Sequence, residues 1–268
     1  MWVDYHIHTT HSVDGYASPS VMCRQAIAVG LREVAITDHL DSNPSDEGAG
    51  RFDPERYFRD LDPLRTELAD HLSLCVGVEV GEPHEYPSIV EGLGAWPFDV
   101  IIGSVHYVGH RGVHASLFDD LPLDRALSAY FDLALQIASC RRVDVLGHLD
   151  YFQRYTCRRN MPPFDPCRWE GPIRAVLEAA IKNDVALEVN TSGVRQAPGV
   201  CFPGQTILTW YHQMGGRAVT IGSDAHYVEH VGANLSDAVR LLTEVGFNSL
   251  CVFKGRRRST LPLPRVDH

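Results

Sequence analysis

The sequence predicts an α/β fold in which parallel strands close into a barrel. Short apolar segments alternate with helical patterns along the whole chain, and apolar strands separated by helices are typical of parallel sheets buried on both faces. No glycine-rich phosphate loop follows the first strand, which favours a closed barrel over an open doubly wound sheet. No change of composition marks a linker, so residues 1–268 are expected to form one domain.

Seven or eight strands are expected. The first begins the chain, where Val3, Tyr5 and Ile7 alternate with Asp4 and the next polar residues. The later strands are short apolar runs, expected at 33–37, 72–80, 98–105, 143–146, 185–189, 217–222 and 250–253.

Helical patterns fill the intervals between these strands. A serine and a proline at 18–19 provide an N-cap and a first helical position, and Gly30 stands where that helix would end. A second helix is expected from 53 to about 71, interrupted or kinked at Pro63. Further helices are expected at 88–96, 124–140, 172–183, 205–214 and 235–245, and residues 41–50 form a polar loop.

Composition excludes several functional classes. The formal net charge of −10 argues against general binding to nucleic-acid phosphates. We expect no signal peptide and no membrane span, because no apolar stretch approaches about 20 residues. Seven scattered cysteines indicate reduced thiols in a cytoplasmic protein. The basic run at 254–258 is expected to be a solvated tail after the last strand.

Metal-ligand side chains occupy the carboxyl ends of six of the expected strands. In a barrel these ends meet on one face. The residues are His6, His8, His39, Glu79, His106, His148, Asp224 and His226, and Asp14 follows in a nearby turn. The alternative is that each of these residues has only a structural role, as a cap or a core histidine. That explanation would be needed independently at six strand ends.

Nitrogen and carboxylate ligands without thiolates suit zinc, manganese or iron(II) in catalytic service. Nine such side chains are more ligands than one or two ions with open coordination positions require, so two or three divalent ions are expected. Glu79 can bridge two of them through its two oxygens.

The segments around these ligands resemble the motif set of the PHP (polymerase and histidinol phosphatase) superfamily, in the expected order between residues 4 and 226. They are 6–9 (HIHT), 37–39 (TDH), 77–79 (GVE), 104–106 (SVH), 147–148 (GH) and 223–226 (SDAH). The whole length is similar to the bacterial histidinol-phosphate phosphatases of that superfamily. The resemblance implies a distorted (β/α)7 TIM-like barrel with a trinuclear site.

Carried over residue by residue, the resemblance implies three ligand groups. They are His6, His8, Glu79 and Asp224 for one ion, Glu79, His106 and His148 for a second, and Asp14, His39 and His226 for a third. His11 is not demanded by the family pattern and is expected to support the ligands or lie at the surface.

The resemblance also implies hydrolysis of a phosphate monoester by a hydroxide that bridges two ions. It favours L-histidinol phosphate as the substrate and histidine biosynthesis as the pathway. Alternatives left open are another small phosphorylated metabolite or nucleotide, or a non-catalytic metal-binding module. The oligomeric state and the metal identity are not given by the sequence.

Three arginines are candidates for the phosphate, because the guanidinium fork matches phosphate oxygens. Arg195 stands in a loop whose arginine contacts phosphate in the histidinol phosphatase branch, and Arg154 and Arg158 follow His148. Each could instead be a solvated loop residue. Glu82 and Asp150 could face a cationic substrate or act as structural caps. No general acid stands out, since His230 is expected at the surface.

Overall fold

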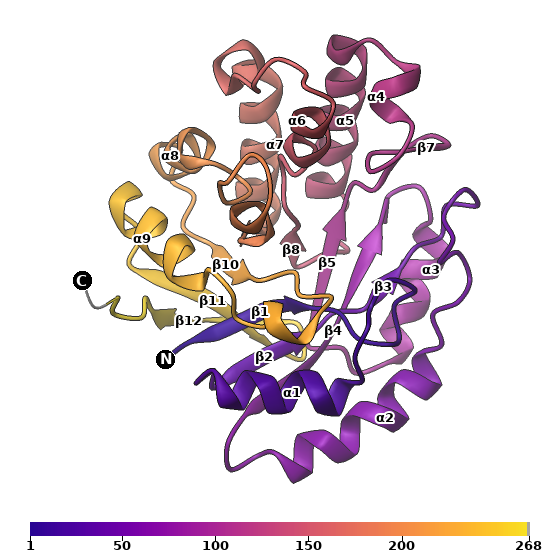
Figure 1. Ribbon diagram of the computed structural model, residues 1–268, viewed down its shortest axis with the longest axis vertical. Coiled ribbons are helices and arrows are strands. Elements are labelled where there is room, and N and C mark those ends of the chain that lie inside the picture. Colours follow the sequence, from indigo (N-terminus) through magenta and orange to yellow (C-terminus); the bar gives the residue numbers. More distant parts are fainter. Residues whose placement is uncertain (267–268) are drawn as a thin grey trace.

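The computed structural model describes residues 1–266 and has parallel strands at its centre, with helices outside them (Figure 1). Within these residues seven strands follow one another side by side, in the order β1-β2-β4-β5-β8-β9-β10. They are β1 (Val3–Ile7), β2 (Glu33–Ile36), β4 (Ser73–Gly81), β5 (Val100–Ser104), β8 (Val145–Leu146), β9 (Ala186–Asn190) and β10 (Val219–Gly222). All neighbouring pairs along this path are parallel.

The last strand returns to the first at their carboxyl ends. The backbone N–H of Asp224 donates to the carbonyl of His6 over 2.8 Å, and that of His8 donates to the carbonyl of Ala225 over 2.9 Å. Because these bonds lie beyond the end of β10, the barrel is closed mainly at the face where the strands end. The predicted (β/α)7 barrel, distorted from a regular one, is confirmed.

Amphipathic helices cover the outside of the barrel. In α5 the buried side chains of Leu127, Tyr130, Phe131 and Ala134 recur at helical spacing and bury one face. The longer helices are α1 (Pro19–Ala28), α2 (Pro54–Glu67), α5 (Leu123–Ser139), α7 (Glu170–Asn183), α8 (Gln205–Gln213) and α9 (Leu235–Val245). The shorter ones are α3 (Pro87–Gly92), α4 (Leu117–Asp120) and α6 (Gln153–Arg158), with 3₁₀ turns at η1 (Leu93–Ala95), η2 (Pro166–Trp169), η3 (Ser192–Arg195) and η4 (Val228–His230). Within residues 1–266 no helix has the length and apolarity that a bilayer crossing requires.

The second helix is not interrupted at Pro63. Helix α2 runs through Pro63 and ends at Glu67, short of the expected His71. Proline removes one backbone hydrogen bond from a helix interior. Burial of Tyr57 and Leu61 on the inner face of α2 offsets that loss, and the helix remains continuous.

The basic run at 254–258 is exposed, as expected, but it is not a tail. The run lies in an antiparallel hairpin formed by β11 (Ser249–Lys254) and β12 (Arg257–Pro262). Arg256 Nε bonds to Asp144 Oδ2 over 2.9 Å, and Arg258 Nη2 bonds to Asp184 Oδ1 over 2.5 Å. Because these aspartates precede β8 and β9, the hairpin packs at the amino-terminal end of the barrel, opposite the strand ends that carry the predicted ligands.

Short strands outside the barrel path were not predicted. Strand β3 (His39–Leu40) pairs with β4, and β6 (Tyr107–Val108) forms a small hairpin with β7 (Arg111–Gly112). The two-residue β3 matters for function, because its pairing places His39 directly opposite Glu79.

Candidate metal centre

The carboxyl ends of the barrel strands bring the predicted ligands together around Glu79. This residue is 1% exposed and lies in β4 near the middle of the sheet. Five imidazole rings surround its carboxylate, those of His6, His8, His39, His106 and His148. The ends of five barrel strands therefore contribute to one cluster, as expected for side chains at the carboxyl ends of a barrel.

The two oxygens of Glu79 face different sets of rings. Oε2 lies 3.1 Å from His6 Nε2, 3.5 Å from His8 Nε2 and 3.1 Å from His39 Nδ1. Oε1 lies 2.9 Å from His148 Nε2 and 3.3 Å from His106 Nε2, and it accepts a hydrogen bond from the Ser104 hydroxyl. The carboxylate thus has one oxygen toward each of two ligand groups.

Asp224 and Asp14 complete the cluster on the side of His8. Asp224 Oδ1 lies 3.4 Å from His8 Nε2, and Asp14 Oδ2 lies 3.1 Å from His226 Nε2. His39 Nε2 is 3.7 Å from the same Asp14 oxygen. The ring of His8 stacks between those of His39 and His226, with centroid distances of 4.2 and 4.1 Å.

The turn that carries Asp14 is held by a buried carboxylate. Asp38 accepts hydrogen bonds from the backbone N–H and hydroxyl groups of both Thr9 and Ser12. A side chain at Gly15 would collide with the carbonyl oxygen of Thr9, so the close return of the chain requires glycine there. These contacts direct Asp14 back over the end of β1.

Two further carboxylates support the imidazole rings from behind. Glu188 Oε1 lies 2.6 Å from His6 Nδ1, and its other oxygen accepts the backbone N–H of His148. Asp41 Oδ1 lies 2.8 Å from His106 Nδ1, and Asp41 Oδ2 lies 3.4 Å from His39 Nδ1. Carboxylates in this position fix the orientation and basicity of metal-binding histidines.

The sequence analysis missed both of these supporting residues. Asp41 was assigned only to the start of a loop, and Glu188 only to an apolar strand. A signal was present in each case. Asp41 follows His39 by two residues, and Glu188 is an acidic residue in the middle of a buried strand, where a partner is required.

The cluster carries strong electrostatic coupling. Burial lowers the pKa of His6, but Glu188, Glu79 and Asp224 outweigh this effect and raise that pKa well above its usual value. Burial also lowers the pKa of His39, but Glu79 and Asp14 outweigh this effect and raise that pKa to about 9. Burial lowers the pKa of His8 to about 3, with help from the neighbouring His226 and His39.

The donor atoms fit divalent cations. The buried ring nitrogens without a hydrogen-bond partner within residues 1–266 include three that face Glu79, namely His6 Nε2, His8 Nε2 and His39 Nδ1. Buried polar atoms normally have a partner. Three sets of donor atoms each lie within 4.8 Å of one another, namely His6, His8 and Asp224, then His39, Glu79 and His106, then His8, His39 and His226. Nitrogen and carboxylate donors of this kind can hold zinc, manganese or iron(II).

The three candidate arginines lie at different depths. Arg195, in η3, is the most enclosed. Its Nη2 donates to the carbonyl of Ser223 over 2.7 Å, whereas its buried Nε and Nη1 have no hydrogen-bond partner within residues 1–266. Burial lowers the pKa of Arg195, and the charge of Arg154 lowers it further, while Asp224 raises it. Arg154 is half-buried, and Arg158 is exposed and bonds to Gln196.

The remaining candidates lie outside the cluster. His11 packs edge-on against Tyr57, with its Nε2 3.3 Å from Asp60 Oδ2. Glu82 accepts the backbone N–H groups of His106 and Tyr107, which makes it a structural cap. His230 is half-buried, with its ring edge-on to that of Tyr227.

A family model described as "PHP domain" matches residues 4–192, most of the chain. The chain belongs to the PHP domain family. This PHP protein is 30% identical to a Thermotoga maritima protein named "Probable histidinol-phosphatase", over 97% of this chain and 99% of that one. It is 27% identical to the Lactococcus lactis protein named "Histidinol-phosphatase", with 95% of each chain covered.

Solved structures agree with this family assignment. The crystal structure of histidinol phosphate phosphatase from Lactococcus lactis, complexed with zinc, L-histidinol and phosphate, superposes on this PHP chain with a TM-score of 0.86. The sequence identity is 25%, and the match covers 96% of this chain and 98% of that chain. A crystal structure from Listeria monocytogenes, 20% identical with a TM-score of 0.74, shares the fold.

Proposed function

We propose that this protein hydrolyses L-histidinol phosphate to L-histidinol and phosphate, with two or three divalent metal ions as cofactors. The observation that carries the proposal is the buried cluster of imidazoles around Glu79. The cluster lies in a fold that is similar to that of a histidinol phosphate phosphatase crystallised with zinc, L-histidinol and phosphate. The reaction belongs to histidine biosynthesis, and we expect the single domain of residues 1–268 to carry it out in the cytoplasm.

The proposed metal ligands lie at the barrel's carboxyl face, where Asp14 is exposed and the others are buried or half-buried. They are His6, His8, Asp14, His39, Glu79, His106, His148, Asp224 and His226. The opposed oxygens of Glu79 support its role between two groups, one with His6 and His8 and one with His106 and His148. Asp14 and His226 support a third group with His39. Bound divalent ions supply activation of water and neutralisation of phosphate charge.

The chain's own residues position the substrate. Arg195 has two buried, unpartnered nitrogens beside Asp224, so we propose that it donates charge-assisted hydrogen bonds to phosphate oxygens. Arg154 lies close enough to lower the pKa of Arg195, and it adds positive charge to the same place. Arg158 is exposed and is assigned to the rim. In the reaction the oxygen of water bonds to phosphorus, the ester P–O bond breaks, and the leaving alkoxide takes a proton from water.

A panel of phosphomonoesters tests this proposal. The protein loaded with zinc or manganese is assayed with L-histidinol phosphate, phenyl phosphate, a sugar phosphate and a nucleoside monophosphate. We expect kcat/KM for L-histidinol phosphate to exceed the others by at least about tenfold, the selectivity that a few specific contacts provide. Equal values would indicate a general phosphoesterase of the same family. No hydrolysis of any ester would indicate a metal-binding module.

Glu188→Gln is expected to weaken metal binding without removing a ligand. The amide still accepts the N–H of His148, but it no longer carries the charge that orients His6. Loss of such a supporting carboxylate typically costs about 10- to 100-fold in metal affinity or activity. Metal competition with a chelator measures the affinity, and added metal should restore most of the activity. Unchanged affinity would contradict the supporting role of Glu188.

Metal affinity is expected to fall as pH falls. His39, with a pKa of about 9, is protonated in the metal-free protein below that pH, and the pKa values of His6 and His106 are raised as well. Each displaced proton weakens apparent binding by about tenfold per pH unit below the pKa. We therefore expect the apparent zinc Kd to rise by more than about tenfold per unit between pH 9 and pH 6. A chelator competition that shows a constant Kd over this range would contradict this coupling.

A further inference from the structure

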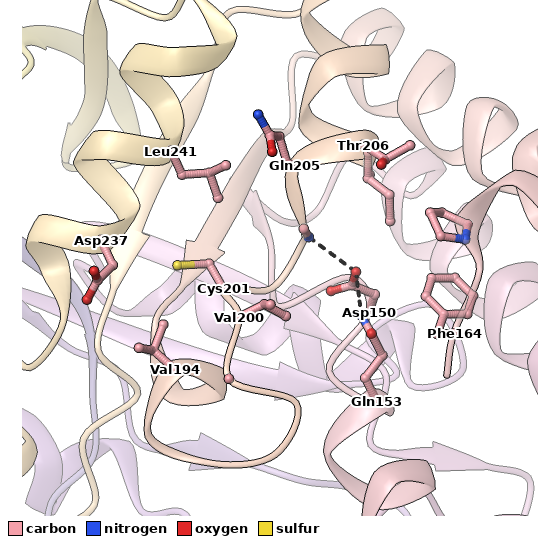
Figure 2. Close-up of a pocket in the computed structure, with 14 residues that line it drawn as sticks. Asp150, Gln153, Phe164, Val194, Val200, Cys201, Gln205, Thr206, Asp237 and Leu241 are labelled. Atoms are coloured by element: carbon pink, nitrogen blue, oxygen red, sulfur yellow. Dashed lines mark hydrogen bonds between the residues drawn. The ribbon is translucent and has the colours of Figure 1, made fainter. Parts of the chain in front are cut away.

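A cavity of about 420 Å³ lies between residues 192–204, the start of α8 and the helix α9. Figure 2 shows the side chains around it. Among the residues that form its walls are Asp150, Phe164, Val200, Cys201, Ile207 and Leu241. None of the proposed metal ligands and none of the three candidate arginines is a wall residue in the part of the chain that the structure describes. The cavity is therefore distinct from the metal centre.

Asp150 supplies a carboxylate with one unused oxygen. The residue is 1% exposed, and its Oδ2 accepts hydrogen bonds from Gly204 N–H over 3.3 Å and from Gln153 Nε2 over 2.9 Å. Its Oδ1 is buried without a hydrogen-bond partner among residues 1–266. In Figure 2 this second oxygen points to the side of Val200, another wall residue, and away from Phe164. A buried carboxylate oxygen left unpaired is costly, so this atom requires a donor.

The charges on the cavity wall favour a cationic donor. No lysine, arginine or histidine of residues 1–266 lines the cavity. The second acidic wall residue, Asp237, already bonds to Arg240 Nη2 over 2.6 Å and to Asn234 Nδ2 over 3.1 Å. A positively charged group of a ligand would therefore bind at Asp150.

The remaining walls favour an organic ligand over a metal ion. Phe164, Ile207 and Leu241 contribute apolar surface to the wall of the cavity. Calcium and magnesium require about six or more oxygen ligands, whereas Asp150 has a single free oxygen here. Pockets of a few hundred Å³ with apolar walls and few polar groups are typical of small-molecule sites.

We propose that this cavity binds a small organic ammonium ion, whose N–H donates to Asp150 Oδ1 and whose apolar body packs on Phe164, Ile207 and Leu241. The site goes beyond the proposed phosphatase reaction and does not depend on it. Its wall includes Val194, the neighbour of Arg195, so the ligand lies behind the loop that carries the candidate phosphate-binding arginine.

Calorimetry on the full, zinc-loaded chain tests the site with three probes of equal size, benzylamine, benzyl alcohol and benzoate. We expect benzylamine to bind at least about tenfold more tightly than benzyl alcohol, because a charge-assisted hydrogen bond is the stronger one. Benzoate is expected not to bind. Asp150→Asn keeps an oxygen for Gly204 but loses the free acceptor, and should weaken benzylamine binding by at least about tenfold. Similar affinities for the amine and the alcohol would overturn the proposal.

Two further variants locate the bound amine. Leu241→Trp fills the cavity and should abolish benzylamine binding, whereas Val21→Trp, on the exposed face of α1, should leave it unchanged. Leu241→Trp also decides the matter if Asp150→Asn fails to fold. Arg195→Ala should leave the affinity for benzylamine within about twofold, because Arg195 is not a wall residue. Binding that survives Leu241→Trp, or is lost in Arg195→Ala, would overturn a separate site in this cavity.

Discussion

Glu79→Gln is expected to remove bound metal and to lower kcat/KM by roughly a thousandfold or more. Metal ions contribute several kcal/mol of transition-state stabilisation, and each 1.4 kcal/mol is a factor of ten. Burial raises the pKa of Glu79, but His6, His106 and His39 outweigh burial and lower the pKa well below its usual value. The carboxylate is therefore ionised. The glutamine amide has the same shape but no charge and only one oxygen. It therefore cannot serve both ligand groups as the two carboxylate oxygens of Glu79 can.

Metal analysis of the purified variant, followed by assay with added zinc or manganese, measures this effect. Glu82→Gln is the matched control, since Glu82 is equally buried and lies three residues further along the chain. Its Oε1 accepts two backbone N–H groups, which a glutamine oxygen can still do. The control should retain its full metal content. A Glu79→Gln protein that keeps all its metal would show that Glu79 does not bridge the metal groups.

The barrel could be predicted from the sequence because its strands are local patterns. Short apolar runs such as Val34–Ile36 and Val219–Ile221 have enough β-branched residues to be found from sequence alone, and the helices between them have clear start signals. The seven strands of the path and their parallel arrangement agree with that prediction. The closure of the barrel was harder to predict, because β1 and the end of β10 are joined mainly by backbone groups, those of His6 with Asp224 and of His8 with Ala225.

The C-terminal hairpin shows why a local charge pattern misled the prediction. A run of basic residues at 254–258 is typical of a solvated tail. Its role depends on Asp144 and Asp184, which are about 70 to 110 positions away in the sequence. Such partners come together only when the barrel has formed. No property of the run itself indicates them.

The site was predictable to the extent that strand ends identify it. Nine ligand candidates follow from residue type and position, and the structure brings all of them together. The stacking of the rings within the cluster was not predictable. His8 groups with His6 and Asp224, as the family pattern implies, and its ring also stacks between those of His39 and His226, because ring packing depends on three-dimensional placement.

Arg195→Ala is expected to raise KM for the phosphoester by about 10- to 100-fold, the cost of losing charge-assisted hydrogen bonds. The reason lies in two buried guanidinium nitrogens that have no partner among residues 1–266, while Nη2 is fixed by the carbonyl of Ser223. Substrate phosphate satisfies the two free nitrogens, and removal of the side chain leaves those oxygens without their donors. A smaller decrease in kcat accompanies the rise in KM if the same contacts tighten in the transition state.

Two control variants separate charge from geometry. Arg195→Lys keeps the positive charge but loses the fork, and should recover only part of the affinity. Arg158→Ala removes an exposed arginine at the rim, whose Nη2 donates to Gln196 Oε1 over 3.3 Å, and should raise KM by no more than about threefold. Steady-state kinetics on the metal-loaded variants provides both constants. If Arg195→Ala left KM and kcat unchanged, the unpartnered nitrogens would serve the fold of the loop and not the phosphate.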